Sequence, residues 1–509
     1  MLAKVHSVIL SGIEAIECEV EVDVSSRGFS GVNIVGLPDA AVKESIDRIK
    51  AALINCGYRF PKHRTLVNLA PADIRKEGPV FDLPIALGIL MADGQISLEL
   101  TKNFLIIGEL ALDGRLRSVK GSLSIALLAA EKNYRGVLVP RENVPEAAVV
   151  EDIEAIGVGS LTEAVGFLAQ RLPLEPTRVD TEQLFSQVSH YDLDFAEVRG
   201  QEHAKRAMTI AAGGGHNMLM IGPPGSGKTM LAQRLPTILP PLSLTEALET
   251  TKIYSAVGLL KSGQALVGIR PVRTPHHSAS PIALVGGGSN PQPGEVSFAH
   301  NGVLFLDEMP EFQRSTLEMI RQPLEDGTVT ISRVQSSMTF PAKFILIGAM
   351  NPCFCGYYGH PRKKCRCTPG QVEKYMGKIS GPLLDRIDIH LEVPALALDR
   401  FRTTANGQSS SQMREKVLQA RQIQQERFKN KPESVNARMG PRLLRTHCQL
   451  DSTCEAILRS AVGELGLSAR AHDKILRVAR TIADLESIPA IKSEHIAEAI
   501  QYRRLDRVM

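Results

Sequence analysis

A stretch near the middle of the chain carries the strongest chemical signal. Residues 222–229 read Gly-Pro-Pro-Gly-Ser-Gly-Lys-Thr and fit the pattern G-x-x-x-x-G-K-[ST] in full. Glycines let backbone N–H groups curl around a phosphate, and the following helix adds positive charge at its N-terminus. We expect the whole loop to bind the nucleotide: Gly222, Pro223, Pro224, Gly225, Ser226, Gly227, Lys228 and Thr229. Lys228 would reach the β- and γ-phosphates of ATP or GTP, and Thr229 would hold Mg²⁺.

Two further polar sites follow apolar segments that are typical of buried strands. Val303 to Leu306 leads to Asp307 and Glu308, and Phe344 to Ala349 leads to Asn351. Asp307 would coordinate Mg²⁺, directly or through water, and Glu308 would polarise the attacking water. Asn351 would help to position that water beside the γ-phosphate. Together these sites predict hydrolysis of ATP or GTP.

Half of the eight cysteines lie in one short segment, as Cys353, Cys355, Cys365 and Cys367. Four thiolates suit tetrahedral Zn²⁺, although C-x-C pairs are tighter than the usual spacing of zinc ligands. We expect a structural zinc site in a hairpin beside the ATP site. The alternatives are an iron–sulfur cluster, four reduced free thiols, and a site in which His360 replaces one sulfur.

Two places on the chain could contact DNA. The loop between the cysteine pairs combines aromatic and basic side chains, which can stack on bases and neutralise phosphates. These are Tyr357, Tyr358, Arg362, Lys363, Lys364 and Arg366. The turn Asp326-Gly327 and the segment Thr328 to Phe340 predict a hairpin with Arg333 near its tip, where it could grip phosphates. A solvated loop and an ordinary exposed arginine are the alternatives.

An inserted loop, Arg270 to Ser278, contains two adjacent histidines with no assigned chemistry. We expect His276 and His277 to serve packing or a turn.

Composition bounds the class of protein. The chain has 509 residues, of which 43% are hydrophobic and 22% charged, as in folded globular proteins with two to four domains. The longest apolar run, Leu83 to Ala92, is far shorter than the roughly 18 residues of a membrane span. We therefore expect no membrane contact and, without a basic-then-apolar leader, a cytoplasmic location. The net charge is only +4, so any contact with nucleic acid must come from local patches.

The elements that must position these residues divide the chain into three parts. Residues 1–170 mix helices and strands as an α+β domain, and residues 171–193 form a linker. Residues 194–394 alternate strands and helices, and residues 395–509 contain amphipathic helices. In the first part the pattern predicts helices over Ala40 to Asn55 (capped by Asp39), Leu83 to Met91 and Ser124 to Glu131. It predicts strands over Ile13 to Val24, Thr65 to Leu69, Phe104 to Leu110 and Gly136 to Pro140.

Several stretches of the sequence resemble those of a known family. Asp194 to Val393 is similar to an AAA+ module of the magnesium-chelatase type, and the whole chain resembles the ComM/YifB family of magnesium-chelatase-like ATPases. The matching stretches are 198–207, the phosphate loop, 270–278, 293–295, 302–308, 348–353 and 381–388. The resemblance implies an AAA+ core with a parallel sheet, a C-terminal helical lid, and a homo-hexameric ring with ATP sites between subunits.

The resemblance also implies roles for residues outside the phosphate loop. Arg386 matches the arginine finger, which acts on the neighbouring subunit's nucleotide through a permanently charged guanidinium. Arg470 matches the sensor-2 arginine of the lid, with Arg477 as a second candidate. A surface ion pair is the alternative for either arginine. Val198 and Gly200 match positions near the adenine.

The first part resembles a different fold, the Lon/S5-like proteolytic domain of Lon-type proteases, most clearly from Gly108 to Pro140. A serine–lysine peptidase needs a hydroxyl beside its base. Val80 stands where the nucleophilic serine should be, and Ser124 stands where the lysine should be. Lys120 is nearby but four positions early. We expect a non-proteolytic domain that serves as a structural or DNA-contacting platform.

The family resemblance implies a helicase-like motor that drives branch migration on single-stranded or branched DNA during recombination of incoming DNA. Its cofactors would be ATP, Mg²⁺ and structural Zn²⁺. The alternative is an ATP-driven motor that remodels a protein partner, as the magnesium-chelatase motor subunit does. The Lon-like domain and the cysteine cluster resemble ComM/YifB and not the chelatase motor, which favours DNA.

Overall fold

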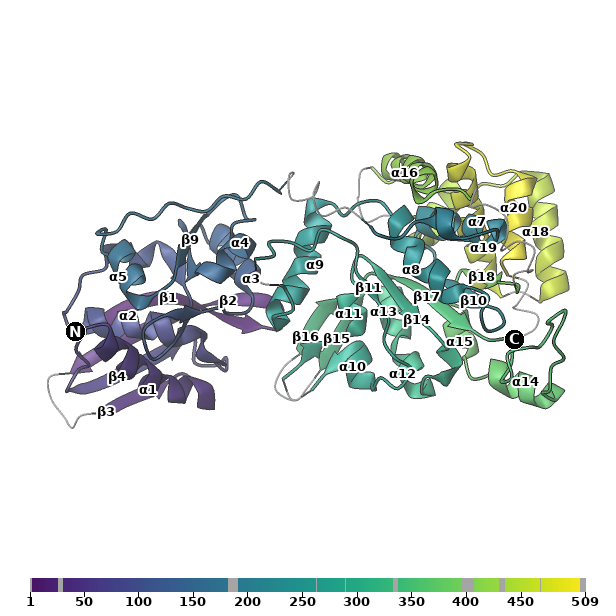
Figure 1. Cartoon of the computed structure of the whole chain (residues 1–509). Helices are drawn as coiled ribbons and strands as arrows, with labels where there is room; N and C mark the ends of the chain where they lie inside the picture. The colour runs from purple at the N-terminus through teal and green to yellow at the C-terminus, as the bar shows by residue number, and fades with distance from the viewer. Residues whose placement is uncertain are drawn as a thin grey trace. The chain divides into compact units, whose positions relative to one another are not determined.

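A computed structural model describes residues 2–25, 31–181, 191–261, 263–288, 290–332, 337–395, 407–429, 435–466 and 468–503. The chain forms two compact units, whose elements Figure 1 labels. The first comprises Met1–Val188 and Ser243–Gly268, and the second comprises Ser189–Leu242 and Ile269–Met509. The segment 243–268 lies inside the range 194–394 that the sequence assigns to the ATPase core, yet it packs with the first unit.

The first unit contains a four-stranded sheet in the order β1-β2-β4-β3. Its strands are β1 (Leu2–Ser11), β2 (Glu14–Ser25), β3 (Gly31–Val35) and β4 (Arg64–Ala70), and only the β3–β4 pair is parallel. Helix α1 (Ala40–Asn55) begins as predicted after Asp39, whose carboxylate accepts the N–H of Val42 at 2.7 Å. Helix α2 (Asp82–Ala92) is apolar around its whole circumference and is therefore buried.

A second sheet of this unit has three parallel strands in the order β5-β8-β9. These are β5 (Phe104–Ile106), β8 (Gly136–Pro140) and β9 (Glu154–Val158), accompanied by α3 (Ser122–Glu131), α4 (Val144–Ala147) and α5 (Leu161–Leu168). The strand predicted over Phe104 to Leu110 is divided into β5 and β6 (Glu109–Leu110), and β6 pairs with β7 (Leu116–Arg117). The chain leaves the sheet at Gly108, because the N–H of Gly108 donates to the carbonyl of Val80 at 3.1 Å instead of to a strand.

Helix α9 (Leu244–Val257) packs against α3 and belongs to this unit. The buried carboxylate of Glu146 joins the two helices, since it accepts the N–H of Leu123 at 2.7 Å and the hydroxyl of Ser255. Lys252 adds an ion pair with Glu14 at 2.6 Å. A helix from the middle of the chain is thus anchored to the N-terminal elements by named polar contacts.

The second unit is built on a five-stranded parallel sheet in the order β11-β14-β17-β10-β18. The strands are β10 (Met218–Ile221), β11 (Val272–Arg273), β14 (Val303–Leu306), β17 (Ile345–Met350) and β18 (Ile389–Glu392). Strands β14, β17 and β10, which Figure 1 draws side by side, are buried along their whole length, as apolar runs in a parallel sheet are. The predicted parallel sheet is confirmed. Because its strands are parallel, their carboxyl ends meet at one edge.

Helices α7 (Glu202–Gly214) and α8 (Lys228–Ile238) pack against this sheet. The C-terminal part of the chain is helical, as predicted, and comprises α16 (Ser410–Arg427), α17 (Pro441–His447), α18 (Ser452–Leu465), α19 (Ala469–Leu485) and α20 (Ser493–Gln501). Apolar side chains of the strands and of α16 and α19 share one core with those of α7 and α8. Of the helices that the structure describes, none is long and apolar enough to cross a bilayer.

Shorter elements fill the connections of the second unit. They are α10 (Pro281–Val285), β12 (Gly286–Gly287), β13 (Gln292–Pro293), α11 (Glu295–Phe298), α12 (Arg314–Met319), α13 (Arg321–Asp326), α14 (Pro369–Met376) and α15 (Gly381–Leu384). The predicted hairpin is confirmed: β15 (Thr328–Ser332) pairs antiparallel with β16 (Ser337–Pro341). Its DNA-contact candidate, Arg333, lies outside the described residues.

Candidate active site

The phosphate loop joins the buried strand β10 to helix α8, as the motif requires. Gly225 and Gly227 have φ angles of +76° and +89°, in the region that side chains with a Cβ avoid. The N–H of Gly222 donates to the carbonyl of Met350 at 3.2 Å, which fixes the start of the loop to β17. A Cβ on Gly222 would stand 2.2 Å from the carbonyl oxygen of Val393, so only glycine fits there. The glycines therefore allow the curved backbone of the phosphate loop, and the contacts of Gly222 fix where it starts.

The Lys228 side chain turns back over this loop. Its ammonium donates to the carbonyls of Gly222 at 2.7 Å and Pro223 at 3.2 Å, and to the Asn351 side-chain oxygen at 3.3 Å. Only 8% of the residue is exposed, and burial lowers the pKa of Lys228 although nearby carboxylates oppose the shift. An arriving phosphate would offer this buried cation an anionic partner in place of neutral carbonyls.

Hard oxygen ligands meet beside the lysine. The hydroxyl of Thr229, in the first turn of α8, donates to a carboxylate oxygen of Asp307 at 2.7 Å. Asp307 follows β14, and Asn351 follows β17, so the shared edge of the sheet brings them together with the loop. A hydroxyl and a carboxylate are the donors that Mg²⁺ takes beside nucleotide phosphates, so this pair fits the metal.

Glu308 has a backbone conformation that is rare for a residue with a side chain. Its φ and ψ are 49° and 43°, and residues held there are concentrated at functional sites. The exposed carboxylate lies 3.5 Å from Nδ1 of His277. The expectation of a turn role holds for His276, whose Nδ1 lies 2.8 Å from the hydroxyl of Ser278. His277 instead reaches the candidate catalytic carboxylate, a contact that the sequence did not reveal.

A cleft of about 440 Å³ collects most of these groups. It is lined by residues 224–230 together with Asp307, Glu308, Met350 and Asn351. The residues predicted near the adenine, Val198 and Gly200, are not among the described residues that line it. The next residue, Gln201, does contact the loop: its side-chain amide donates to the carbonyl of Ser226 at 2.6 Å. Gln201 belongs to the stretch 198–207 that carries the family resemblance, which is the signal that could have found it.

Arg386 and Arg470, the predicted arginine finger and sensor-2 arginine, do not line the 440 Å³ cleft. Arg386 is largely covered, forms an ion pair with Glu325 of its own chain, and donates to the carbonyl of Pro382 at 2.5 Å. Its Nε has no hydrogen-bond partner among the described residues. Arg470, in the first turn of α19, is 67% exposed and lies 3.8 Å from Asp385.

The four clustered cysteines converge on one point. The sulfur of Cys353 lies 3.4 Å from that of Cys355 and 3.7 Å from that of Cys365, and the latter two are 3.6 Å apart. With Cys367, all four sulfurs lie within 4.8 Å of one another. A tetrahedron with Zn–S bonds of about 2.3 Å has edges of about 3.8 Å, so these residues fit a Zn²⁺ ion.

The four thiols have unequal surroundings. Backbone N–H groups of Arg366 and Tyr357 point at Cys355 and lower its pKa to about 6, which favours the thiolate that a metal needs, whereas burial and the neighbouring sulfurs raise the pKa of Cys365 to about 12 and also that of Cys367. His360, considered as a substitute ligand, uses its Nδ1 to accept the N–H groups of Arg362 and Lys363, both at 3.0 Å. It is not part of the group of potential ligands found among the described residues.

The predicted DNA-contact residues of this loop are exposed. Arg362, Lys363 and Lys364 all face solvent, and the ammonium of Lys363 lies 4.7 Å from the ring centroid of Tyr357. The arrangement is open to a polyanion.

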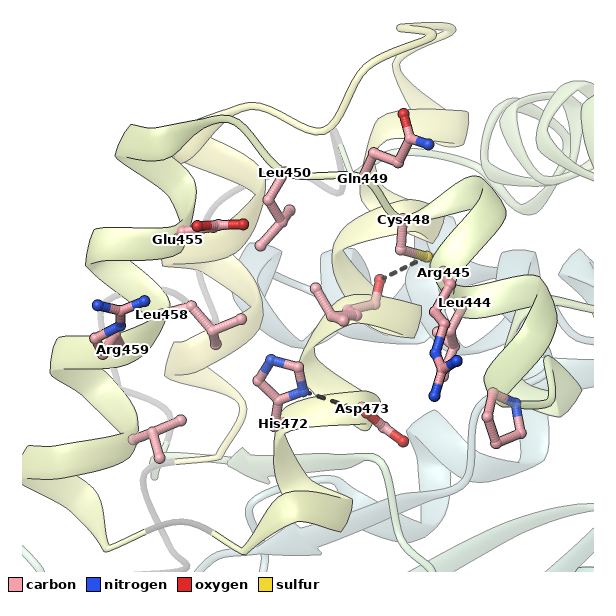
Figure 2. Close-up of a pocket in the computed structure, with 13 residues that line it drawn as sticks. Leu444, Arg445, Cys448, Gln449, Leu450, Glu455, Leu458, Arg459, His472 and Asp473 are labelled. Carbon is pink, nitrogen blue, oxygen red and sulfur yellow. Dashed lines mark hydrogen bonds and ion pairs between the residues drawn. The ribbon is translucent and has the colours of Figure 1, made fainter.

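A larger cleft, of about 660 Å³, lies among the C-terminal helices (Figure 2). Leu444, Leu450 and Leu458 form part of its wall. Arg445, Glu455, Arg459, His472 and Asp473 give it a charged rim. None of the predicted site residues that the structure describes lines this cleft.

Comparison with known proteins shows which families and proteins the chain is similar to. Three family models match consecutive parts: the one for a magnesium-chelatase ChlI subunit matches residues 194–401, and two further ChlI models match residues 20–143 and 407–503. The competence protein ComM of Haemophilus influenzae is 44% identical over 100% of this chain and 98% of its own length. The YifB protein of Escherichia coli is 42% identical over the same shares.

Magnesium chelatases themselves are similar over a smaller part. The 67 kDa subunit of the Heliobacterium mobile magnesium chelatase is 26% identical over 204 residues, which is 33% of this chain. ComM and YifB thus match over the full chain, whereas this chelatase subunit matches a third of it. This chain belongs to the ComM/YifB family of magnesium-chelatase-like AAA+ proteins.

Proposed function

We propose that this chain binds and hydrolyses ATP at the edge of the parallel sheet and uses the energy to move along DNA. The observation that carries the ATPase proposal is the meeting of Lys228, Thr229, Asp307 and Asn351 through direct hydrogen bonds of 2.7 to 3.3 Å. Lys228 and Thr229 begin α8, Asp307 follows β14 and Asn351 follows β17, and hydrolysis of a nucleoside triphosphate needs them in one place.

In this proposal each group has a distinct task. The loop amides and Lys228 hold the phosphates, and Thr229 with Asp307 holds Mg²⁺, which neutralises the developing charge. Glu308 polarises the attacking water, and Asn351 orients it. Arg386 reaches the nucleotide of a neighbouring subunit in a hexameric ring, and Arg470 acts from the helical lid.

DNA is the proposed track, and branched or single-stranded DNA is the proposed form. ComM, similar over its whole length, is named as a competence protein, whereas the chelatase subunit is similar over a third of this chain. We therefore propose a cytoplasmic, helicase-like branch-migration factor in recombination of incoming DNA. Arg333, Arg362, Lys363 and Lys364 are its proposed phosphate contacts.

The test is steady-state ATP turnover by the purified chain, alone and with single-stranded, duplex and branched DNA. Glu308→Gln supplies the background rate. We expect branched or single-stranded DNA to stimulate turnover, followed by strand displacement on a branched substrate. Turnover that is indifferent to every DNA would contradict the DNA proposal and favour remodelling of a protein partner.

We also propose that the first unit is a platform without peptidase activity. Ser124, at the position of the lysine base, is buried, and its hydroxyl donates to the carbonyl of Ile13 at 2.7 Å. A hydroxyl already bonded to the backbone cannot take the place of a lysine base.

The cysteine cluster is proposed to hold one structural Zn²⁺. Elemental analysis of protein purified without chelator should find about one zinc per chain, as four thiolates around one ion require. Protein that is folded and zinc-free would contradict this assignment.

A further inference from the structure

The cysteine segment, Cys353 to Cys367, begins directly beside the candidate active site and contains turns but no strand, unlike the hairpin expected from the sequence. Asn351, whose side chain contacts Lys228, is two residues before Cys353, the buried member of the cluster. The carbonyl of Cys353 accepts the N–H of Gly356 at 3.0 Å, which closes a tight turn around Cys355. The first half of the cluster is thus one short, bonded turn attached to the end of β17.

This turn is in contact with the phosphate loop. A Cβ built on Gly356 would stand 2.6 Å from Cδ and 2.8 Å from Cγ of Pro224. Real Cβ atoms do not approach other heavy atoms so closely, so the backbone of the turn is in contact with the Pro224 ring. Gly356 also has φ +80°, a conformation in which glycine is unstrained. Gly356 is therefore a glycine at the point where the turn around Cys355 contacts the phosphate loop.

We propose that the metal in the cysteine cluster braces the phosphate loop, so that nucleotide affinity depends on whether the cluster is occupied. This inference rests on the proposed functions of the loop and of the cluster. A bound cation would tie Cys353 and Cys355 to Cys365 and Cys367. It would thereby hold Gly356 against Pro224 and Asn351 against Lys228. The cluster is then a regulatory metal site as well as a structural one.

Loss of the metal has a direct mechanical consequence. The sulfurs of Cys353, Cys355 and Cys365 lie 3.4 to 3.7 Å apart, and without a cation the contacts between them are only weak thiol hydrogen bonds. Without the metal, neither the turn that carries Gly356 nor Asn351, which contacts Lys228, is fixed by the cluster. A nucleotide must then order the loop by itself, and that ordering reduces its affinity.

The first experiment removes one ligand. The variant is Cys367→Ser, because Cys367 is the candidate ligand farthest in sequence from Asn351. The zinc content of the full-length variant and its Kd for a fluorescent ATP analogue are measured with excess Mg²⁺. We expect loss of zinc together with an increase in Kd of about tenfold or more, which corresponds to about 1.4 kcal/mol. Loss of zinc with an unchanged Kd, in protein that keeps its far-UV circular dichroism, would overturn the inference.

The second experiment keeps the metal and disturbs only the contact. Gly356→Ala places a methyl group against Pro224, whereas Gly359→Ala is its matched control. Gly359 has a similar φ of +71° with nothing within 4 Å of the added Cβ. We expect Gly356→Ala to retain zinc and weaken ATP binding, and Gly359→Ala to change neither. Equal Kd values for the two alanine variants would overturn the proposal.

A compensating change identifies the contact. Pro224→Ala removes the Cγ and Cδ atoms that face Gly356. The double variant Gly356→Ala/Pro224→Ala should bind ATP more tightly than Gly356→Ala alone, and failure of this rescue would contradict direct contact as the cause. Failure of the proposed functions looks different: wild-type protein would then bind no ATP, or would contain no zinc.

Discussion

Lys228 and Glu308 lie in the same cleft but act on different steps of the proposed reaction. The buried ammonium of Lys228 is held by carbonyls that a phosphate would replace, so its charge serves binding. Glu308 is exposed, lines the cleft and lies 3.5 Å from His277, where water can approach its carboxylate. The two side chains should therefore separate binding from chemistry.

Substitution of each should give a different defect. We expect Lys228→Ala to abolish ATP binding and turnover, and Glu308→Gln to bind ATP while turnover falls by about a hundredfold or more, as loss of general-base assistance predicts. Equilibrium binding of a fluorescent nucleotide and steady-state phosphate release measure the two effects. Normal hydrolysis by both variants would refute the site assignment.

His277 is predicted to position Glu308. Its Nδ1 lies 3.5 Å from the carboxylate, so His277→Ala should leave the nucleotide Kd unchanged and lower kcat by about 10- to 100-fold, as a misplaced catalytic group does. His276→Ala is the comparison variant: the Nδ1 of His276 contacts Ser278 and its ring packs against that of His277 at a centroid distance of 4.1 Å, so we expect a smaller loss of kcat than in His277→Ala. In a Glu308→Gln background His277→Ala should cause no further loss. An additive loss would mean that His277 does not act through Glu308.

At the scale of elements, the sequence predicts what local pattern determines and misses what the tertiary fold decides. The strands around the phosphate loop and helix α1 have the predicted bounds within a residue, because apolar runs and caps are local signals. The contacts of Gln201 and His277 are not local signals, since each meets its partner across the fold, and for Gln201 only the family resemblance of the stretch 198–207 could have pointed to a role. Helix α9 shows the same limit. Its capping box, Ser243 with Glu246, marks a helix start, but three of the five buried residues of the helix are threonine or serine, and this face does not identify α3 as the partner.

The attachment of α9 to α3 should depend on the hydroxyl of Ser255. Burial raises the pKa of Glu146, and Ser255→Ala would leave this buried carboxyl group with one bond fewer. We expect the variant to lose about 1–2 kcal/mol of local stability, and amide exchange in residues 244–257 to become about 5 to 30 times faster. Glu146→Gln is the control, because its side-chain oxygen still accepts both hydrogens. Unchanged exchange in Ser255→Ala would show that packing alone holds α9.

At the scale of the whole molecule, the family match covers the full chain, and the proposed ring requires contacts between copies of it. Full-length identity of 44% to ComM accounts for both units at once, which no single motif could do. The proposed ring then depends on whether Arg386 can leave its own chain. As a single chain it is paired with Glu325, so a role in the neighbouring site requires that pair to open.

Mixing two inactive variants tests this exchange between subunits. Arg386→Ala keeps an intact phosphate loop, and Lys228→Ala keeps an intact arginine. In a mixed ring a Lys228→Ala subunit can therefore offer Arg386 to the nucleotide of its Arg386→Ala neighbour. We expect each variant alone to be inactive and the mixture to recover part of the ATP turnover, because an arginine finger stabilises transition-state charge in trans. A mixture of Lys228→Ala with Glu308→Gln should stay inactive, since the missing glutamate and the bound nucleotide belong to the same subunit. If the first mixture stays as inactive as the second although both form mixed oligomers, Arg386 is a structural partner of Glu325 and the finger must be sought elsewhere.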